Sequence, residues 1–248
     1  MCPAVAYNNH TGAQNLTTHR DTQVRFTINR HIDRLPAGII GQYSSLAVAD
    51  ICDALGRNAA LPSALKALGV GRMLGSAYTV NLPASENLLL YYAVDNAQPG
   101  DVLVVSCGAY EERAVCGEIM ANLAMKRGLA GFVIDGAVRD ARALREMPFP
   151  VYARSVSPNG PYKAACGEVN VSVSIGNVVI NPGDIIVADD DGIVAVRAEE
   201  AETLAAQAEK ITREGLEKLR RIEERGTLDF TWLYEKLKKS CCTINNGC

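Results

Sequence analysis

Hydrophobic positions along the chain form short continuous runs and longer segments with helical spacing, and the two alternate through its middle. Short apolar runs are typical of buried strands, whereas apolar positions three and four residues apart are typical of helices. Strands are therefore expected at residues 75–82, 102–105, 132–134, 150–153, 169–175, 177–180, 185–188 and 193–196. Helices are expected at residues 22–35, 44–55, 85–98, 117–127, 198–224 and 230–239, with a further short helix after Asp140.

Turn-forming residues separate these elements. Pro99-Gly100 and Pro182-Gly183 each suit the two central positions of a type II turn, and each pair is followed by Asp and an apolar strand. The repeated phrase indicates two similar corners of one architecture. Pro36 is expected to end the first helix, and Asp135-Gly136 is expected to form a turn after the apolar run 132–134.

The order of these elements favours an α/β fold. Strands alternate with helices in the middle of the chain and cluster late, which predicts a layered sandwich with a mixed central sheet and helices outside it. The helix at 198–224 is strongly charged, with Leu204, Ile211, Leu219 and Ile222 on one face, so it is expected to pack on the domain or on a neighbouring subunit. The expected divisions are a flexible N-terminal arm at 1–20, the α/β domain at 21–197, a C-terminal helical extension at 198–239 and a flexible tail at 240–248.

The composition of the chain argues against several classes of function. The formal net charge is −3 and charges of both signs are interspersed, which argues against a nucleic-acid surface. No apolar run approaches the roughly 18 residues of a membrane span. The polar residues 1–20 lack the apolar stretch of a signal peptide, so a cytoplasmic protein is expected. The eight cysteines include no C-x-x-C pair, which favours buried free thiols in a reducing compartment, above all at Cys52, Cys107 and Cys116.

Two segments resemble common ligand-binding motifs, but neither matches its motif in full. The glycines at 69–75 precede a strand and are spaced one residue too widely for a dinucleotide-binding loop. Residues 189–192 read Asp-Asp-Asp-Gly, like the opening of a calcium-binding EF-hand loop. However, Val194 stands where that loop needs glycine. The acidic run is therefore expected to be a tight turn between strands.

The distribution of histidine limits the metal chemistry. All three histidines (His10, His19 and His31) lie in the first 31 residues, so the core has none to serve as a zinc ligand or general base. If a metal binds the core, its protein ligands are mainly oxygens, which favours Mg²⁺ or Mn²⁺. Mg²⁺ commonly keeps several waters and takes only one or two carboxylates.

Two loops carry the candidate chemistry. Gly117-Glu118 opens an expected helix, and Arg139-Asp140 follows an apolar strand, with twenty residues between Glu118 and Arg139. We interpret them as one site, in which a carboxylate holds a divalent metal and the arginine holds an oxyanion. The N–H groups at the helix start would suit a substrate carboxylate. The alternative is that Arg139 and Asp140 form only a surface ion pair at a helix start, which is a common arrangement.

With these residues in place, the chain resembles the RraA-like family. That family includes the class II 4-hydroxy-4-methyl-2-oxoglutarate / 4-carboxy-4-hydroxy-2-oxoadipate aldolases and the regulators of ribonuclease E activity. The resemblance runs from about Asp50 to Arg197. Its landmarks are Asp53 to Gly56, Gly75 to Thr79, Pro99 to Asp101, Gly117-Glu118, Arg127-Gly128, Asp135-Gly136 with Arg139-Asp140, Pro182 to Asp184, and Asp190 to Gly192. It implies an αββα sandwich that assembles as a homotrimer or a dimer of trimers, with sites at subunit boundaries.

The resemblance also implies a reaction. A small 2-oxo acid would bind Mg²⁺ (or Mn²⁺), with Asp140 as a metal ligand and Glu118 orienting a water on the metal. Gly117, Glu118, Ile119 and Met120 would contact the substrate, and Arg139 would stabilise a pyruvate enolate. Retro-aldol cleavage of a 4-hydroxy-2-oxo acid is the implied reaction, with oxaloacetate decarboxylation as a side activity.

Two departures from the family pattern bear on the substrate. Glu118 stands where some members have Asp, and Ala143 stands where other members carry an acid. They leave open a different oxo acid at the same site. The competing hypothesis is a non-catalytic, protein-binding regulator, because a site-like loop can persist for structural reasons.

Overall fold

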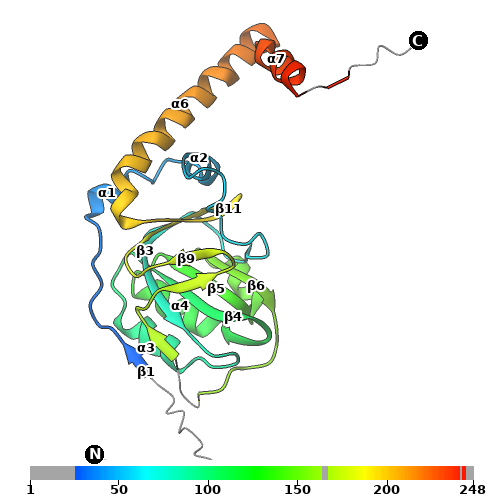
Figure 1. Ribbon diagram of the computed structural model, residues 1–248. Helices are drawn as coiled ribbons and strands as arrows, with labels where there is room; N and C mark the ends of the chain where they lie inside the picture. The colour runs from blue at the N-terminus through cyan, green and yellow to red at the C-terminus, as the bar shows by residue number, and fades with distance from the viewer. Residues whose placement is uncertain (1–25, 164–166, 241, 244–248) are drawn as a thin grey trace, which may run out of the picture.

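The computed structural model describes residues 26–163, 167–240 and 242–243, and its centre is a large mixed sheet (Figure 1). Three consecutive strand pairs, β3–β4, β4–β5 and β5–β6, are parallel, and antiparallel strands flank them. Along the sheet the order is β1 (Phe26–Ile28), β7 (Gly167–Val169), β3 (Met73–Asn81), β4 (Asp101–Cys116), β5 (Gly131–Val138), β6 (Val151–Val156) and β2 (Lys66–Ala67). β10 (Ile185–Asp189) pairs with β3 and with β11 (Gly192–Val196), and β8 (Val173–Ile175) and β9 (Val178–Ile180) form a separate pair.

Alternation along the central strands divides the core into layers. On β4, Leu103 and Val105 face one buried cluster, while Val102 and Val104 face another. The first cluster lies under α3 (Leu88–Asn96), α4 (Glu118–Lys126) and α5 (Ala141–Glu146), and the second lies under β8 and β9. A third joins β10 and β11 to α1 (Ala37–Gly41), α2 (Val48–Ala54) and α6 (Ala201–Arg225). The expected fold class, a layered α/β sandwich with a mixed sheet and a C-terminal helical extension, is confirmed.

The two Pro-Gly-Asp corners form as expected. Gly100 and Gly183 have φ angles of +87° and +89°, the left-handed conformation that a type II turn requires at this position. The following Asp closes each turn: Asp101 Oδ2 accepts the N–H of Gln98 at 2.8 Å, and Asp184 makes the equivalent bond at 2.8 Å. Both corners start buried strands of the sheet.

The prediction of a helix at 22–35 is wrong for the described residues, 26–35. Residues 26–28 form β1, which pairs in parallel with β7. Pro36 precedes α1 instead of ending a helix, in agreement with the preference of proline for helix starts. Strand pairing with residues far along the chain has overridden the local helical spacing. The expected N-terminal arm and residues 22–25 lie outside the described residues, as does most of the expected tail.

Two strand boundaries also differ from expectation. β5 does not turn at Asp135-Gly136 but continues to Val138, because β4 runs beside it over the whole length. The strand expected at 169–175 is two strands, β7 and β8, in different sheets. Asn170 ends β7 with a φ angle of +54°, a left-handed conformation that breaks an extended run. The acidic residues 189–192 form the expected tight turn between β10 and β11.

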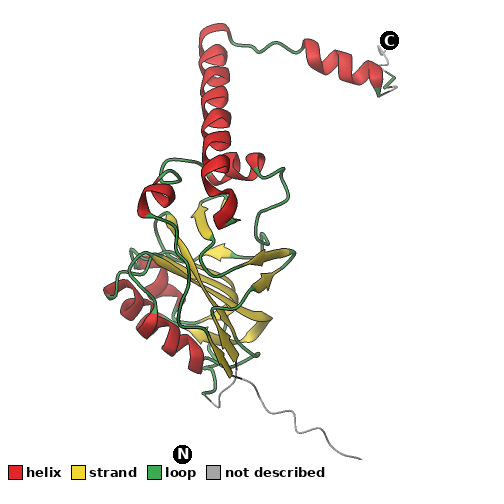
Figure 2. Ribbon diagram, turned by 60° about the vertical axis from the view of Figure 1, so that its left-hand side comes forward, coloured by secondary structure: helices red, strands yellow, loops and turns green. Residues whose placement is uncertain are grey.

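α6 leaves the domain and carries α7 (Thr231–Lys239) at its far end (Figures 1 and 2). Its first turns follow the short helix η1 (Ala198–Glu200) and pack on α2, where Thr212 Oγ1 donates a hydrogen bond to Asp50 Oδ2 at 2.6 Å. The expected apolar face is buried at Leu204 and exposed at Leu219 and Ile222. Of the helices that the model describes, none combines the length and apolar character needed to cross a bilayer.

Candidate functional site

Asp140 connects the two loops that the sequence singled out. Its Oδ2 atom accepts the backbone N–H of Glu118, the first residue of α4, at 3.1 Å. One residue before Asp140, the N–H of Arg139 donates to the carbonyl oxygen of Cys116 at 3.0 Å. The loop after β5 is therefore joined to the start of α4 through both backbone and side chain. The structure brings the predicted residues together at the carboxyl ends of two parallel strands, where ligands collect in α/β sheets.

The backbone of Asp140 is strained. Its φ and ψ angles are +59° and +38°, a left-handed conformation that Asp tolerates better than most residues but that still costs free energy. Asp140 immediately precedes α5, yet its carboxylate turns toward the start of α4. In this geometry the Asp140 carboxylate therefore does not stabilise the dipole of α5. Strain of this kind is concentrated at functional sites, which favours the functional interpretation.

Gly117 permits this close approach. A Cβ atom at position 117 would lie 2.4 Å from Asp140 Oδ2 and 2.8 Å from the Cγ atom of Arg139, both shorter than van der Waals contact. The backbone of Gly117 is extended, so the absence of a side chain, and not an unusual φ angle, is what the site requires. With glycine here, the N-terminus of α4 and its partial positive charge meet the Asp140 carboxylate directly.

Arg139 and Asp140 form a loose pair. Their closest atoms, Nε and Oδ2, are 3.7 Å apart, and the side chains are 44% and 41% exposed. A pair this open contributes little to stability. The guanidinium has five N–H donors in a planar fork, which suits recognition of a carboxylate or an enolate oxygen. The pair therefore retains the capacity to bind a ligand.

A small cavity of about 60 Å³ lies beside this pair. Four of the predicted substrate contacts, Gly117, Ile119, Met120 and Arg139, line it together with Asp140. The side chain of Glu118 is exposed and is not part of this lining, so the structure places only its backbone N–H at the site. The role of the Glu118 carboxylate remains a prediction.

Sequence reasoning missed several residues that line the same cavity, among them Asn87, Tyr91 and Lys163. Asn87 is 3% exposed; its Nδ2 donates to the carbonyl oxygen of Val115 at 2.8 Å, and its Oδ1 has no partner among the described residues. The Nζ atom of Lys163 lies 5.4 Å from the centroid of the Tyr91 ring. No motif marks these residues, because they reach the site from distant segments of the chain.

The donors at the site fit a hydrated hard cation. Among the described residues, no three His, Cys, Asp or Glu side chains gather closely enough to enclose a metal ion. One or two carboxylates with several waters are sufficient for Mg²⁺, and Asp140 is the acid that lines the cavity. Cys116, which also lines the cavity, is a poor ligand, because burial raises the pKa of its thiol and keeps it protonated.

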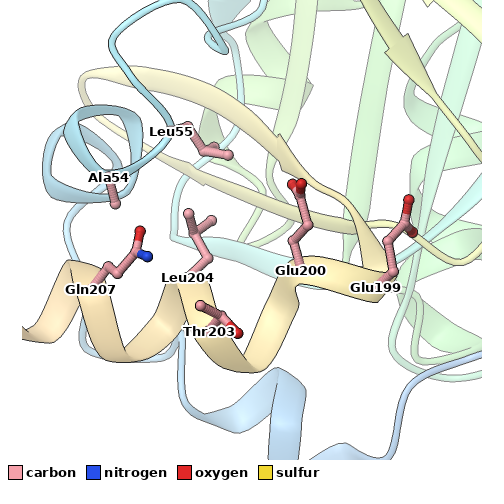
Figure 3. A pocket seen from close by; sticks show the side chains of 7 residues that line it. All are labelled: Ala54, Leu55, Glu199, Glu200, Thr203, Leu204 and Gln207. Carbon is pink, nitrogen blue, oxygen red and sulfur yellow. The ribbon is translucent and has the colours of Figure 1, made fainter.

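A larger groove of about 400 Å³ lies elsewhere, between α2 and the base of α6 (Figure 3). Leu55 approaches it from the end of α2, Glu200 from η1, and Leu204 and Gln207 from α6. None of the residues predicted for the site lines it. Size alone therefore does not identify the functional site in this chain.

Two of the three thiols that the sequence predicted to be buried are buried. Among the described cysteines, Cys107 and Cys116 are buried and free, and Cys52 is free and half-buried. Burial raises the pKa of the Cys107 thiol to about 12, with a further contribution from the nearby Asp135 carboxylate. Both buried thiols are therefore neutral near pH 7 and behave as small core side chains.

Comparison with known proteins bears directly on this geometry. A family model described as "RraA-like: Aldolase/RraA" matches residues 48–195, which include both loops of the site. A relative from Halalkalibacterium halodurans is 36% identical over 172 residues, which cover 69% of this chain and 82% of the relative. Its name is "Putative 4-hydroxy-4-methyl-2-oxoglutarate aldolase".

Two solved structures with similar folds are named after inhibition of RNA processing or of a ribonuclease. The RNA-processing inhibitor RraA from Thermus thermophilis superposes with a TM-score of 0.57 at 32% identity, covering 60% of this chain and 92% of that one. RraAS2 of Streptomyces coelicolor, described as an unusual member of the RNase ES inhibitor RraA family, has a TM-score of 0.66 at 29% identity, covering 77% and 100%. The relatives thus include proteins named as an aldolase and proteins named as regulators.

Proposed function

Because the chain belongs to the RraA-like family, we propose that it is a metal-dependent carbon–carbon lyase that cleaves a 4-hydroxy-2-oxo acid by a retro-aldol reaction. The observation that carries the proposal is the open Arg139–Asp140 pair, placed against the N-terminus of α4 beside a cavity. A purely structural ion pair has no need of a strained Asp and a neighbour without a side chain. Those features are typical of a ligand site.

Substrate binding uses the start of α4. The first N–H groups of a helix have no carbonyl acceptor within the helix, so those of Ile119 and Met120 suit the carboxylate of a 2-oxo acid. Arg139 then lies beside the 2-oxo oxygen. Asn87 Oδ1, buried and without a partner among the described residues, suits a hydroxyl donor of the substrate, and Lys163 suits a second carboxylate.

The reaction requires a place for negative charge. When the C3–C4 bond breaks, its electron pair forms the enolate of pyruvate, with the charge on the former 2-oxo oxygen, and the 4-hydroxyl group loses its proton to become a carbonyl. Arg139 stabilises that oxygen by charge and hydrogen bonding. Glu118 orients the water that takes the proton, since the described core contains no histidine. Protonation of C3 then releases pyruvate.

Asp140 is the residue that would hold a divalent cation, Mg²⁺ or Mn²⁺, directly, and Glu118 would orient a water beside it. Such a cation would supply Lewis-acid stabilisation of the same developing charge. Loss of CO₂ from oxaloacetate produces the same enolate, so we expect oxaloacetate decarboxylation as a side activity.

We propose that the protein is cytoplasmic, because a reducing compartment suits the free thiols of the core.

A second copy of the chain is part of the proposal. Ile119 is 76% exposed and lines the cavity, and the contacting helices α3 and α4 carry three further exposed apolar side chains: Leu88, Tyr91 and Leu123. An apolar rim around a small polar cavity is typical of an interface. We propose a homotrimer or a dimer of trimers whose neighbouring subunits close the site. Light scattering at the working concentration measures this; an active monomer would contradict it.

Two alternatives follow from particular observations. The solved relatives named as RraA inhibitors favour a protein-binding regulator without catalytic activity. Ala143, which replaces an acid found in other family members, favours a different oxo acid at the same site. The regulator predicts no turnover of any oxo acid, whereas the second alternative predicts turnover with an altered substrate preference.

One assay distinguishes these possibilities. Pyruvate release is measured from a panel of 4-hydroxy-2-oxo acids and from oxaloacetate, after chelation and again after adding Mg²⁺ or Mn²⁺. The proposal expects activity that chelation abolishes and either metal restores. Full activity in a metal-stripped sample would refute the metal dependence, and no turnover of any acid would favour the regulator.

A further inference from the structure

The strand that leads into the site contains two excursions. Where β4 pairs with β5, Ser106 lies opposite Asp135, Tyr110 opposite Gly136 and Ala114 opposite Ala137. Each of these two steps along β5 therefore corresponds to four residues on β4. The residues between these pairs bulge from the sheet, and the second excursion, at 111–113, carries the half-buried Arg113. Bulges often redirect a side chain next to a functional site.

This second excursion holds the loop at 157–163. The carbonyl oxygen of Glu112 accepts the hydroxyl of Ser157 at 2.8 Å and the Nδ2 of Asn159 at 3.1 Å. The N–H of Ala114 donates to the carbonyl oxygen of Asn159 at 2.9 Å. The far side of the loop is fixed by the N–H of Tyr162, which donates to the carbonyl oxygen of Ser85 at 2.7 Å. The loop is thus attached along both edges.

Arg113 makes two contacts with this loop. Its Nη1 donates to the carbonyl oxygen of Gly160 at 2.9 Å, and its guanidinium carbon lies 4.5 Å from the centroid of the Tyr162 ring. A guanidinium can stack on an aromatic ring and donate a hydrogen bond in its own plane at the same time. Arg113 therefore fixes both the position and the tilt of the loop.

The same loop touches the candidate site. Pro161 and Lys163 line the cavity, and a Cβ atom on Gly160 would lie 3.2 Å from Nη1 of Arg139. Gly160 is thus in contact with both arginines: its carbonyl oxygen accepts from Arg113, and its Cα side faces the guanidinium of Arg139. Any shift of the loop changes the space available to Arg139.

We infer that Arg113 is a positioning residue: by fixing the loop at 157–163, it sets the place of the Arg139 guanidinium and of Lys163. This inference rests on the proposed function, because Arg139 is there the group that stabilises the enolate. A displacement of about 1 Å in such a group can reduce a rate by roughly 10²-fold. Arg113 itself does not line the cavity.

The test compares Arg113→Met and Tyr162→Ala with wild type. Each variant removes one half of the stacked pair, so kcat for pyruvate release is expected to fall by about 10-fold to 10²-fold while KM changes little. Arg113→Lys is expected to recover part of the loss, since an ammonium keeps one hydrogen bond and the charge but not the planar fork. Tyr162→Phe keeps the ring and is expected to retain wild-type kcat.

Arg142→Met is the matched control for charge. Arg142 is 93% exposed on α5 and pairs only with Glu146, at 3.3 Å, among the ion pairs of the described residues, so its loss should leave kcat unchanged. Hydrogen exchange adds a readout that does not require turnover. The Tyr162 amide is expected to exchange faster in Arg113→Met than in Arg142→Met, with similar Tm values.

The outcomes separate the two hypotheses. An active wild type with unchanged kcat in Arg113→Met and Tyr162→Ala would overturn the positioning role and leave the proposed function standing. An inactive wild type would refute the proposed function, and the exchange rates would then decide whether Arg113 fixes the loop. Equal exchange rates of the Tyr162 amide in Arg113→Met and Arg142→Met would also overturn the inference that Arg113 fixes the loop.

Discussion

β5 and the loop after it supply the Asp residues of two Arg–Asp pairs that differ in distance and in exposure. Asp135 and Arg154 are in close contact, with Oδ1 and Nε 2.5 Å apart and side chains only 5% and 14% exposed. Arg139 and Asp140 are 3.7 Å apart and nearly half exposed. The first pair joins adjacent parallel strands inside the sheet, whereas the second connects two loops at its edge. The same two residue types thus serve two purposes a few residues apart.

Burial decides whether the two charges of an ion pair can also bind a ligand. In the buried pair, each charge is desolvated and satisfied by the other, so neither is free for a ligand, and the loss of one leaves the other buried and unpaired. In the exposed pair, solvent screens the attraction and each group keeps bonding capacity. Stability should therefore depend on the first pair and activity on the second.

Asp135→Ala is expected to have the largest effect. It leaves the Arg154 guanidinium buried without its carboxylate, which typically costs about 3–5 kcal/mol of unfolding free energy. Denaturant unfolding monitored by circular dichroism measures this. Asp140→Ala is the matched control, with a smaller expected cost of about 1–2 kcal/mol, because the open pair contributes little and alanine tolerates the left-handed backbone less well than Asp. Equal stability losses in the two variants would remove the contrast between the pairs.

Asp140→Ala is expected to abolish activity, with a smaller loss of stability than Asp135→Ala. The carboxylate is the proposed metal ligand and the acceptor for the Glu118 N–H, so the variant should lose Mn²⁺ binding and pyruvate release together. Titration with Mn²⁺, followed by electron paramagnetic resonance, measures binding independently of turnover. A variant that binds Mn²⁺ as wild type does would exclude Asp140 as a ligand.

Arg139→Ala is expected to keep Mn²⁺ binding while kcat falls by roughly 10²–10³, the usual cost of losing an oxyanion stabiliser. Arg139→Lys should recover little, because one ammonium cannot reproduce the planar fork. The same ranking should hold for oxaloacetate, since both reactions pass through the same enolate. Arg142→Ala, three residues further along, controls for the loss of a positive charge. Wild-type kcat in a folded Arg139→Ala would leave the pair as a surface contact.

Glu118→Gln is expected to have the smallest effect, with a kcat between those of wild type and Arg139→Ala. An amide can still orient a water but carries no charge, and the backbone N–H that bonds to Asp140 is unchanged. Steady-state kinetics of the same substrates measures it. A loss as large as that of Asp140→Ala would instead show that the Glu118 carboxylate is needed directly for metal binding.

Much of the fold could be read from local features of the sequence. Apolar runs such as 102–105 had to be buried strands, and the Pro-Gly pairs before Asp101 and Asp184 had to be turns, because backbone conformation there depends on the residues themselves. The two loops of the candidate site were predictable for the same reason, as a helix start and a strand end. The helix expected at 22–35 failed because pairing of β1 with β7 is a contact between distant segments.

From the sequence alone, Glu118, Arg139 and Asp140 could be singled out as the residues proposed to carry the chemistry, in a core without histidine. Only the tertiary structure decided that Asp135 is a closed structural partner of Arg154 and Asp140 an open one, since burial depends on what other strands bring alongside. It likewise brought Asn87, Lys163 and Arg113 to the site. Local spacing encodes strands, turns and helix ends, but the environment of a charge is set by segments far away in the chain.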